Sequence, residues 1–405
     1  MNKLTLADLD LDRHQVLVRV DFNVPLSERP PTQPFEDVSY AVADDTRIRA
    51  ALPTVRAIME AGGRAILLSH LGRPKGQPNS SLSLAPVAEH LGGLLDGKVR
   101  FCNSTTGPLV DRTLRSMPDG TVLLLENTRF HPGETRNDAD FAKDLAQLGD
   151  VFVNDAFGTA HRAHASNVGV AQRIPKAAAG LLLERELRLL GDALHHPTPP
   201  VVALLGGAKV SDKIGVIRSL AAMADHILIG GAMSYTFLKA RGFNTGASLV
   251  EDDWVDDALN MFVAAAGKLK LPVDHIVSTD LRATAEARTV SRDIPAGFMG
   301  LDIGPATIER FLDILRRANT IIWNGPMGVF EEPAFAAGTH AMASGLAEVT
   351  RKNAITVVGG GDSVAAVHRA GLASQITHVS TGGGAMLQFL EGHDLPGVSV
   401  LTDRS

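Results

Sequence analysis

Short apolar runs rich in Val, Ile and Leu recur along the chain, and longer amphipathic segments separate them. Continuous apolar strands that alternate with helices are typical of parallel sheets buried on both faces. Nine such runs are more than one doubly wound sheet holds comfortably, so the pattern predicts an α/β fold with two sheets. The runs are VLVRV (16–20), RAILLSH (64–70), TVLLLEN (121–127), DVFVND (150–155), PVVALLGG (200–207), DHILIGG (225–231), TIIWNG (320–325), AITVVGGG (354–361) and THVSTGGG (377–384).

A break between the two sheets is expected near residues 176–200. The segment 176–194 predicts a helix with Leu183, Leu187 and Leu190 on one face, and HHPTPP (195–200) then stops it, because proline cannot continue a helix. Such a helix could serve as an interdomain hinge or simply as a surface connector. The proline-rich segment 27–39 predicts an exposed polar loop.

Composition and charge narrow the possible functions. The chain is 45% hydrophobic and 21% charged, and its net charge of -6 argues against a nucleic-acid-binding protein while allowing a local basic cleft. A lone cysteine, Cys102, excludes an internal disulfide and predicts a buried apolar side chain. We find neither a signal peptide nor a run of the ~20 apolar residues that span a bilayer, so we expect a soluble, cytoplasmic protein.

In the second half, each of the five predicted strands ends in glycine. Ligands bind outside the carboxyl ends of parallel strands, and glycine allows close backbone approach with free amide hydrogens. Five glycine turns on one sheet edge predict a nucleotide or phosphate site, although neither G-x-G-x-x-G nor the P-loop spacing is present. GGAKVSDK (206–213) places Lys209 and Lys213 four residues apart, which predicts one face of a helix beginning there; two solvated surface lysines are the alternative.

In the first half, basic side chains replace the glycines at the predicted strand ends. Guanidinium groups bind phosphate and carboxylate by two-point contacts, so together they predict a shared site for a small, multiply charged anion. Asp21 and Asn23 lie among these cations and could orient a substrate hydroxyl, or Asp21 could simply pair with a neighbouring arginine. The basic residues at the strand ends are His70, Arg73, Arg129, His161, Arg162 and His164, with Arg19 inside the first strand and Arg47 near the start of a helix.

Nine ordered motifs make the chain similar to the phosphoglycerate kinases over about residues 16–392. They are RVDFNVP, SHLGRP, LLLENTRF, VNDAFGTAHRAHAS, GGAKVSDK, LIGGAM, WNGPMGVFE, VVGGGDS and STGGGAMLQFLEG. The resemblance implies two Rossmann-like three-layer αβα domains with parallel sheets, joined by an interdomain helix. Residues 1–177 would then bind 3-phosphoglycerate or 1,3-bisphosphoglycerate, 178–196 form the hinge helix, and 197–389 bind ADP or ATP with Mg²⁺, while a tail of about 390–405 packs on the N-terminal domain. A cytoplasmic monomer of glycolysis and gluconeogenesis is the family expectation.

Roles for individual residues follow from the same resemblance. It implies that the substrate is bound by Asp21, Phe22, Asn23, Arg47, His70, Leu71, Gly72, Arg73, Arg129 and Arg162, with Arg19, His161 and His164 in the outer part of the basic patch. It implies that the nucleotide is bound by Gly207, Ala208, Lys209, Lys213, Gly231, Asn324, Glu331, Gly360, Gly361, Asp362 and Ser363, with Asp362 as the metal ligand. Catalytic roles fall to Arg47, Lys209, Gly361 and Gly384. Ser363 replaces the threonine of many relatives, and the segment between Asn23 and Arg47 is longer than usual.

The implied reaction is reversible phosphoryl transfer between the acyl phosphate of 1,3-bisphosphoglycerate and ADP, a phosphotransfer with a carboxyl group as acceptor. In reverse the nucleophile is a carboxylate with a pKa near ~3.5, so no general base is needed and catalysis depends on in-line positioning, charge neutralisation and domain closure. A nicotinamide dehydrogenase and a non-catalytic sensor are the alternatives. Asp362 has its own alternative, a simple N-cap at a helix start.

Overall fold

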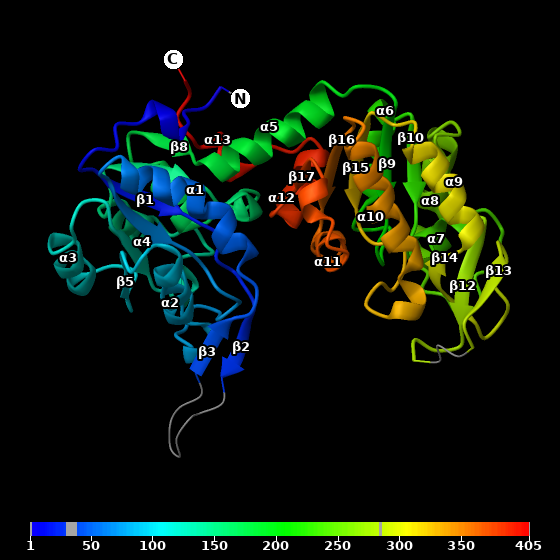
Figure 1. Cartoon of the computed structure of the whole chain (residues 1–405), viewed down its shortest axis with the longest axis horizontal. Helices are drawn as coiled ribbons and strands as arrows, with labels where there is room; N and C mark the ends of the chain where they lie inside the picture. Colours follow the sequence, from blue (N-terminus) through cyan, green and yellow to red (C-terminus); the bar gives the residue numbers. More distant parts are fainter. Residues whose placement is uncertain (1, 30–38, 283–285, 405) are drawn as a thin grey trace. The chain divides into compact units, whose positions relative to one another are not determined.

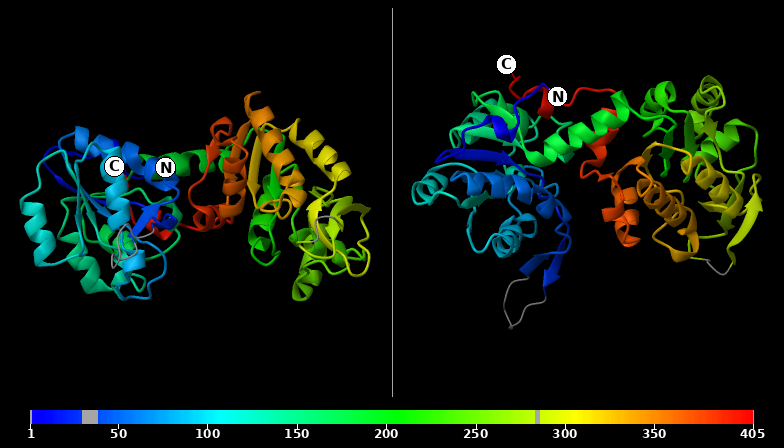
Figure 2. Two further views of the ribbon diagram at one scale, coloured as in Figure 1. Left: turned by 60° about the horizontal axis from the view of Figure 1, so that its bottom comes forward. Right: turned by 45° about the horizontal axis from the view of Figure 1, so that its top comes forward.

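The computed structural model describes residues 2–29, 39–282 and 286–404. The chain forms two compact units (Figures 1 and 2). Unit 1 comprises Met1–Arg188 and Asp394–Ser405, and unit 2 comprises Leu189–His393, so the division falls within helix α5 (Leu181–His195). None of the described helices combines the length and the apolar character needed to cross a membrane.

Unit 1 is built on a six-stranded sheet whose neighbouring strands are all parallel, in the order β5-β6-β4-β1-β7-β8. Its four central strands coincide with the four apolar runs of the first half, and they are buried at nearly every position. Burial on both faces requires helices on both sides, which explains the unbroken apolar runs. The strands are β1 (Gln15–Arg19), β4 (Arg64–Leu68), β5 (Val99–Cys102), β6 (Val122–Leu125), β7 (Val151–Asn154) and β8 (Ala177–Ala179).

The helices of unit 1 follow its strands along the chain. α1 buries Ile48, Val55 and Ile58 in the same core cluster as strand residues such as Val16 and Val18. Its first turn lies beside the loop that follows β1, because Arg47 of α1 donates to Asp21 and to the Asn23 carbonyl. The helices are α1 (Thr46–Glu60), α2 (Ala85–Leu94), α3 (Pro108–Arg115), α4 (Ala139–Ala146) and α13 (Pro396–Ser399).

The carboxyl-terminal tail is hydrogen-bonded into unit 1. The Thr402 amide donates to the Ala177 carbonyl at 2.9 Å, and Asn154 Nδ2 donates to the Gly397 carbonyl at 2.8 Å. Asn154 ends β7, so the tail contacts the same sheet edge that carries the basic residues.

Unit 2 is built on a second six-stranded parallel sheet in the order β11-β10-β9-β15-β16-β17. Five of its strands are the five predicted in the second half. Together the two sheets confirm the predicted α/β fold. The strands are β9 (Val201–Leu205), β10 (His226–Ile229), β11 (Leu269–Lys270), β15 (Thr320–Asn324), β16 (Ile355–Gly359) and β17 (His378–Val379).

Helices α9, α10 and α11 pack against this sheet through one continuous core that includes Phe311, Met342 and Val367. α12 packs against α6, and α8 against α7. The helices of unit 2 are α6 (Ile214–Met223), α7 (Met233–Ala240), α8 (Val255–Ala264), α9 (Pro305–Leu315), α10 (Ala337–Thr350), α11 (Gly361–Arg369) and α12 (Gly383–Leu390).

Two antiparallel additions lie outside the nine apolar runs. In unit 2, β12 (Asp274–Ser278) pairs with β13 (Arg288–Ser291) and β14 (Met299–Ile303). In unit 1, β2 (Leu26–Arg29) pairs with β3 (Ser39–Val42), so the loop predicted for 27–39 is wrong at both ends. Residues 30–38 of that segment lie outside the described residues.

The helix predicted for 176–194 begins later than expected. Residues Ala177–Ala179 form the edge strand β8, and α5 starts at Leu181. Glycine is required at position 180 between the two elements, because a Cβ there would lie 2.2 Å from Asp155 Oδ1. The predicted apolar face is correct, since its leucines are buried. Cys102 is also buried, as predicted.

Candidate active site

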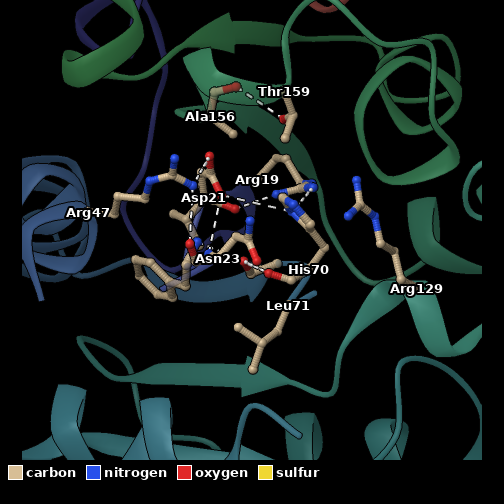
Figure 3. A network of polar contacts seen from close by, with 12 residues as sticks. Arg19, Asp21, Asn23, Arg47, His70, Leu71, Arg129, Ala156 and Thr159 are labelled. Carbon is tan, nitrogen blue, oxygen red and sulfur yellow. Dashed lines mark hydrogen bonds and ion pairs between the residues drawn. The ribbon is translucent and has the colours of Figure 1, made fainter. Parts of the chain in front are cut away.

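In unit 1, the residues singled out from the sequence converge at the carboxyl ends of β6, β4, β1 and β7. These strands are neighbours in the sheet, so the loops that follow them lie side by side. The network includes a charged pair at its solvent side: Arg47 Nη1 donates to Asp21 Oδ2 at 3.1 Å and to the Asn23 carbonyl at 3.2 Å (Figure 3). The pairing of Asp21 with an arginine is therefore real. This pairing uses only one of the nitrogen donors of Arg47, because its Nε and Nη2 have no partner within the described part of the chain.

Gly72 is the residue that joins the loops. Its amide donates to Asn23 Oδ1 at 2.9 Å, and its carbonyl accepts from Arg129 Nη1 at 2.7 Å. Its φ of +60° and the 2.7 Å that would separate a Cβ from Leu82 Cδ2 make glycine necessary here. Gly72 therefore positions two side chains of the predicted substrate-binding set, the carboxamide of Asn23 and the guanidinium of Arg129.

Phe22 and Leu71 anchor these loops through their backbone hydrogen bonds. Phe22 is buried in the core, and its amide donates to Ser69 Oγ at 2.9 Å. Both backbone groups of Leu71 bond to the Asn127 side chain, at 3.1 Å and 2.7 Å. Asn127 was not among the predicted site residues, although it is the second residue after β6 in the LLLENTRF motif.

Three histidines of this region, His70, His161 and His164, have lowered pKa values and are therefore neutral at physiological pH. Burial, and then the charges of Arg19, Arg129, Arg47 and Arg162, hold the pKa of His70 well below its usual value. Burial and the same kind of neighbours lower the pKa of His164 to about 4. The pKa of His161 is lowered too, by burial and Arg162.

The positive charge of the hydrogen-bonded network therefore resides on its guanidinium groups. Burial lowers the pKa of Arg129 to about 10, which still leaves it charged. Arg19 is fully buried, and burial lowers its pKa as well.

A pocket of about 480 Å³ opens beside this network. Three predicted arginines, Arg73, Arg129 and Arg162, line it together with Lys75 and Arg136, which sequence reasoning missed. No carboxylate is among the described residues that line it, so the pocket suits an anion with more than one charge. Lys75 follows directly after the SHLGRP motif, and that position was the available signal. The lining also includes Gly76, His131, Pro132, Thr135 and His164.

In unit 2, the glycine turns after β9, β10 and β15 pack against one another. The Gly207 amide donates to the Pro326 carbonyl at 3.0 Å, and the Gly231 amide donates to the Met327 carbonyl at 2.9 Å. A Cβ on Gly325 would lie 2.1 Å from the Gly206 carbonyl oxygen. The expectation that the amides of Gly207 and Gly231 are free for a ligand is therefore wrong. Gly231 is needed for close backbone packing, because a Cβ there would lie 2.5 Å from the Gly207 nitrogen, whereas Gly207 is favoured by its φ of +103°.

The predicted pair of lysines is divided by the fold. α6 begins at Ile214, so neither lysine lies within it, and the predicted common helix face is wrong. Lys209 is exposed in the preceding turn, beside exposed Ala208. Lys213 is 9% exposed and its Nζ donates to Asn324 Oδ1, which excludes the solvated alternative for this lysine. Burial lowers the pKa of Lys213 to about 8.

Asn324 is the residue of unit 2 whose surroundings most favour a bound ligand. It is 1% exposed, and its Nδ2 is buried with no hydrogen-bond partner among the described residues. A buried donor without an acceptor costs about 1–3 kcal/mol, so a ligand oxygen at this position would remove the cost. Gly360 lies next to it, since a Cβ there would be 3.1 Å from Nδ2.

Two helices begin at the same edge. α11 starts at Gly361 and α12 at Gly383, and a Cβ on Gly383 would lie 3.2 Å from the Gly360 Cα. The first amides of both helices are thus close together, which is a favourable setting for an anion. Gly384, in the first turn of α12, is exposed.

Asp362 does not cap its helix. Gly360 occupies the N-cap position of α11, while Asp362 lies exposed in the first turn, so the interpretation as an N-cap is wrong. Ser363 is buried, and its hydroxyl accepts from the Gly325 amide at 2.5 Å. Glu331 is exposed in the segment after β15.

The donor chemistry fits a magnesium ion that arrives with a nucleotide. Within the described ranges, no three His, Cys, Asp or Glu side chains are grouped to hold a metal. Mg²⁺ is commonly held by one or two carboxylates with water and substrate phosphates, and the exposed carboxylate of Asp362 beside two helix starts matches that pattern.

Comparison with known proteins agrees with this geometry. The sequence model of the family described as "Phosphoglycerate kinase" matches residues 6–393. Proteins named phosphoglycerate kinase from Salinibacter ruber and Rubrobacter xylanophilus are 56% and 54% identical to this chain over 403 and 405 residues, covering 100% of it and 100% and 99% of their own lengths. The structure of phosphoglycerate kinase from Coxiella burnetii is similar with a TM-score of 0.85 at 40% identity, and that from Pyrococcus horikoshii OT3 with 0.83 at 31%; each match covers 98% of both chains. The chain belongs to the phosphoglycerate kinase family.

Proposed function

We propose that the cationic pocket of unit 1 binds 3-phosphoglycerate or 1,3-bisphosphoglycerate and that the glycine-rich edge of unit 2 binds ADP or ATP with Mg²⁺. Phosphoglycerate kinase activity, in glycolysis, is the activity of the family. In domain terms, residues 1–177 with the tail from about 390 bind the triose, 197–389 bind the nucleotide, and 178–196 connect them. The observation that carries the proposal is the pocket lined by five cationic side chains without a carboxylate among the described lining residues.

The proposed reaction requires no proton transfer by a protein side chain. The acyl-phosphate P–O bond of 1,3-bisphosphoglycerate breaks as an ADP oxygen bonds to phosphorus. The leaving carboxylate is a weakly basic anion, because its conjugate acid has a pKa of roughly 3.5. No general base or acid is needed in either direction. The residues must therefore align the two oxygens and stabilise the charge on the phosphoryl group.

Arg47 and Lys209 are the proposed donors to the transferring phosphoryl group, with the first amides of α11 and α12 assisting. Arg47 is suited to this because Nη1 is anchored by Asp21, while its other donors remain available. Lys213 and Asn324 would hold nucleotide phosphate oxygens from the buried side. Mg²⁺, held by Asp362 and the phosphates, would supply charge neutralisation.

Because the two half-sites lie on different units, the proposal includes closure of the units around bound substrates. We expect the radius of gyration in solution to fall when both substrates bind, and an unchanged value in the ternary complex would contradict closure. We further propose that the protein works as a monomer in the cytoplasm.

Separate binding measurements test the assignment of each half-site. By titration calorimetry, Arg129→Ala should weaken 3-phosphoglycerate binding about tenfold or more and leave ADP binding unchanged, since a hydrogen bond to a charged group is worth about 1.5–3 kcal/mol. Asn324→Ala should do the reverse. Arg100→Ala is the matched control, because this arginine of unit 1 bonds to exposed Ser116 and lies outside the pocket. Equal effects of Arg129→Ala on both ligands would contradict the assignment.

A further inference from the structure

A chain of buried hydrogen bonds runs behind the cationic pocket and ends on His70. It starts at Glu134, which is fully buried. Glu134 Oε1 accepts from the Ser166 hydroxyl at 2.6 Å, and Oε2 accepts from the Ser166 amide at 3.0 Å. Because the hydroxyl proton of Ser166 is donated to the carboxylate, the Ser166 oxygen is left to act as an acceptor.

Arg19 uses that acceptor. Its Nε donates to Ser166 Oγ at 2.8 Å, and its Nη1 donates to the Val20 carbonyl. Its Nη2 lies 3.1 Å from Nδ1 of His70 (Figure 3). The side chain is fully buried, so its orientation is set by these contacts. The direction of every bond from Glu134 to Arg19 is therefore fixed by which atoms carry hydrogens.

The last bond determines the protonation of the imidazole. A guanidinium can only donate, so Nδ1 of His70 must present its lone pair to Arg19. Turning the ring by 180° would place a C–H group against the guanidinium and lose the bond. The nearest carboxylate oxygen, Oδ1 of Asp21, lies 3.9 Å from Nδ1, beyond hydrogen-bond distance. The ring proton must then reside on Nε2.

Nε2 has no protein partner within the part of the chain that the structure describes, and His70 is 4% exposed. The charged groups around the ring keep it neutral, because burial and the nearby arginines hold its pKa well below the usual value. His164, whose Nδ1 lies 3.8 Å from Glu134 Oε1, is neutral as well and does not displace the serine from the carboxylate. The arginines that face His70 are Arg19, Arg47, Arg129 and Arg162.

We propose that Glu134, Ser166 and Arg19 are positioning residues that hold His70 as the neutral tautomer protonated on Nε2, so that the ring donates one hydrogen bond to an oxygen of the bound triose phosphate. The second half of this statement rests on the proposed function of the pocket. A neutral donor has a use among guanidinium groups: it adds a directional bond without adding another buried cation to a site that already holds several. Because the donor atom is set by the protein, substrate binding does not have to select between two tautomers.

Nitrogen NMR of the full-length protein labelled in its histidines tests the tautomer directly, without substrate. We expect Nδ1 of His70 to resonate as an unprotonated imidazole nitrogen and Nε2 to carry the directly bonded hydrogen. A proton on Nδ1 would overturn the relay while leaving the pocket assignment intact. Addition of 3-phosphoglycerate should shift the Nε2 resonance; with the tautomer as stated, an unmoved Nε2 would overturn the role of His70 in binding.

Kinetics with variants tests the relay as a whole. Ser166→Ala removes the acceptor for Arg19, and we expect the KM for 3-phosphoglycerate to rise about tenfold, the KM for ATP to stay unchanged, and the His70 resonances to show a mixture of tautomers. Ser116→Ala is the matched control: this exposed serine also accepts from an arginine, Arg100 at 3.1 Å, in the same unit. Should Ser166→Ala not fold, Glu134→Gln keeps the side-chain shape and removes the charge, and the same split in KM is expected. Equal changes in both KM values, or none beyond those of Ser116→Ala, would overturn the proposal.

Discussion

Lys213 is the buried cation of unit 2, and Lys213→Met removes its charge while keeping its length. Burial lowers the pKa of this lysine from 10.5 to about 8. Since each tenfold change in proton affinity corresponds to about 1.4 kcal/mol, keeping the charge at neutral pH costs about 3 kcal/mol. Its hydrogen bond to Asn324 returns about 1–3 kcal/mol. We therefore expect Lys213→Met to leave the free energy of unfolding at pH 7 unchanged or to raise it by up to about 2 kcal/mol.

Nucleotide binding should respond in the opposite direction. A hydrogen bond from a charged donor to phosphate is worth about 1.5–3 kcal/mol, so the Kd for ADP should rise about ten- to a hundredfold in Lys213→Met. The pH dependence has a definite sign. The folded-state pKa lies below the unfolded value, so the burial cost is full below pH 8 and disappears as the pH rises from there towards 10.5. ADP affinity of the wild type should fall as the pH rises through about 8, and that of Lys213→Met should not.

Titration calorimetry with ADP from pH 6.5 to 9.5 and urea unfolding at pH 7 provide the two readings. Lys268→Met is the matched control, because this half-buried lysine of unit 2 donates to the Ala221 carbonyl, away from the glycine turns. If Lys213→Met lost stability but bound ADP as the wild type does, the lysine would be structural and the argument for its role wrong.

Four further predictions follow from single contacts. Arg47→Ala and Lys209→Ala should each lower kcat by about 100-fold or more in steady-state assays, as loss of a preorganised donor worth roughly 3–4 kcal/mol implies; a change under about fivefold would remove that residue from the catalytic set. Gly72→Ala forces a side chain into a left-handed turn and should destabilise the fold by about 1–3 kcal/mol in urea and raise the KM for 3-phosphoglycerate alone; an unchanged KM would show that this turn does not position the site. Asp155, whose pKa burial raises to about 7, contributes stability that is full below pH 3.8 and lost as the pH rises to 7, so the wild type should lose up to about 4 kcal/mol relative to Asp155→Asn between pH 4 and pH 7; parallel unfolding curves would contradict this. Asp362→Asn should weaken ADP binding about tenfold with Mg²⁺ and leave metal-free ADP binding unchanged or tighter; equal weakening in both conditions would argue against a metal ligand.

The central strands of both sheets were predictable because burial on two faces leaves an unbroken apolar signature. Three of the four edge strands, β5, β8 and β11, lack it. Ala177–Ala179 has only small side chains next to strong helix formers, so the pattern extends the following helix over it. β11, with two residues, is too short for any periodicity. The antiparallel strands β12 to β14 lie outside the apolar runs on which the sheets were predicted.

At the candidate site, residue types were predictable but their environments were not. Lys209 and Lys213 look equivalent in GGAKVSDK, yet only Lys213 is buried. Its hydrogen-bond partner Asn324 lies 111 residues further along the chain, so the local sequence does not reveal the difference. The bonding of the glycine amides is equally non-local, since the Gly207 amide donates to the Pro326 carbonyl. No sequence pattern marks Glu134 as part of the site, because its role depends on a hydrogen bond from Ser166, 32 residues away.

The most direct test of the account is ATP formation from 1,3-bisphosphoglycerate and ADP by the purified protein, followed by a coupled assay. We predict that ATP forms, that the reaction requires Mg²⁺, and that Arg129→Ala raises the KM for 1,3-bisphosphoglycerate while Asn324→Ala raises the KM for ADP. A folded protein that binds both ligands but forms no ATP would contradict the central claim.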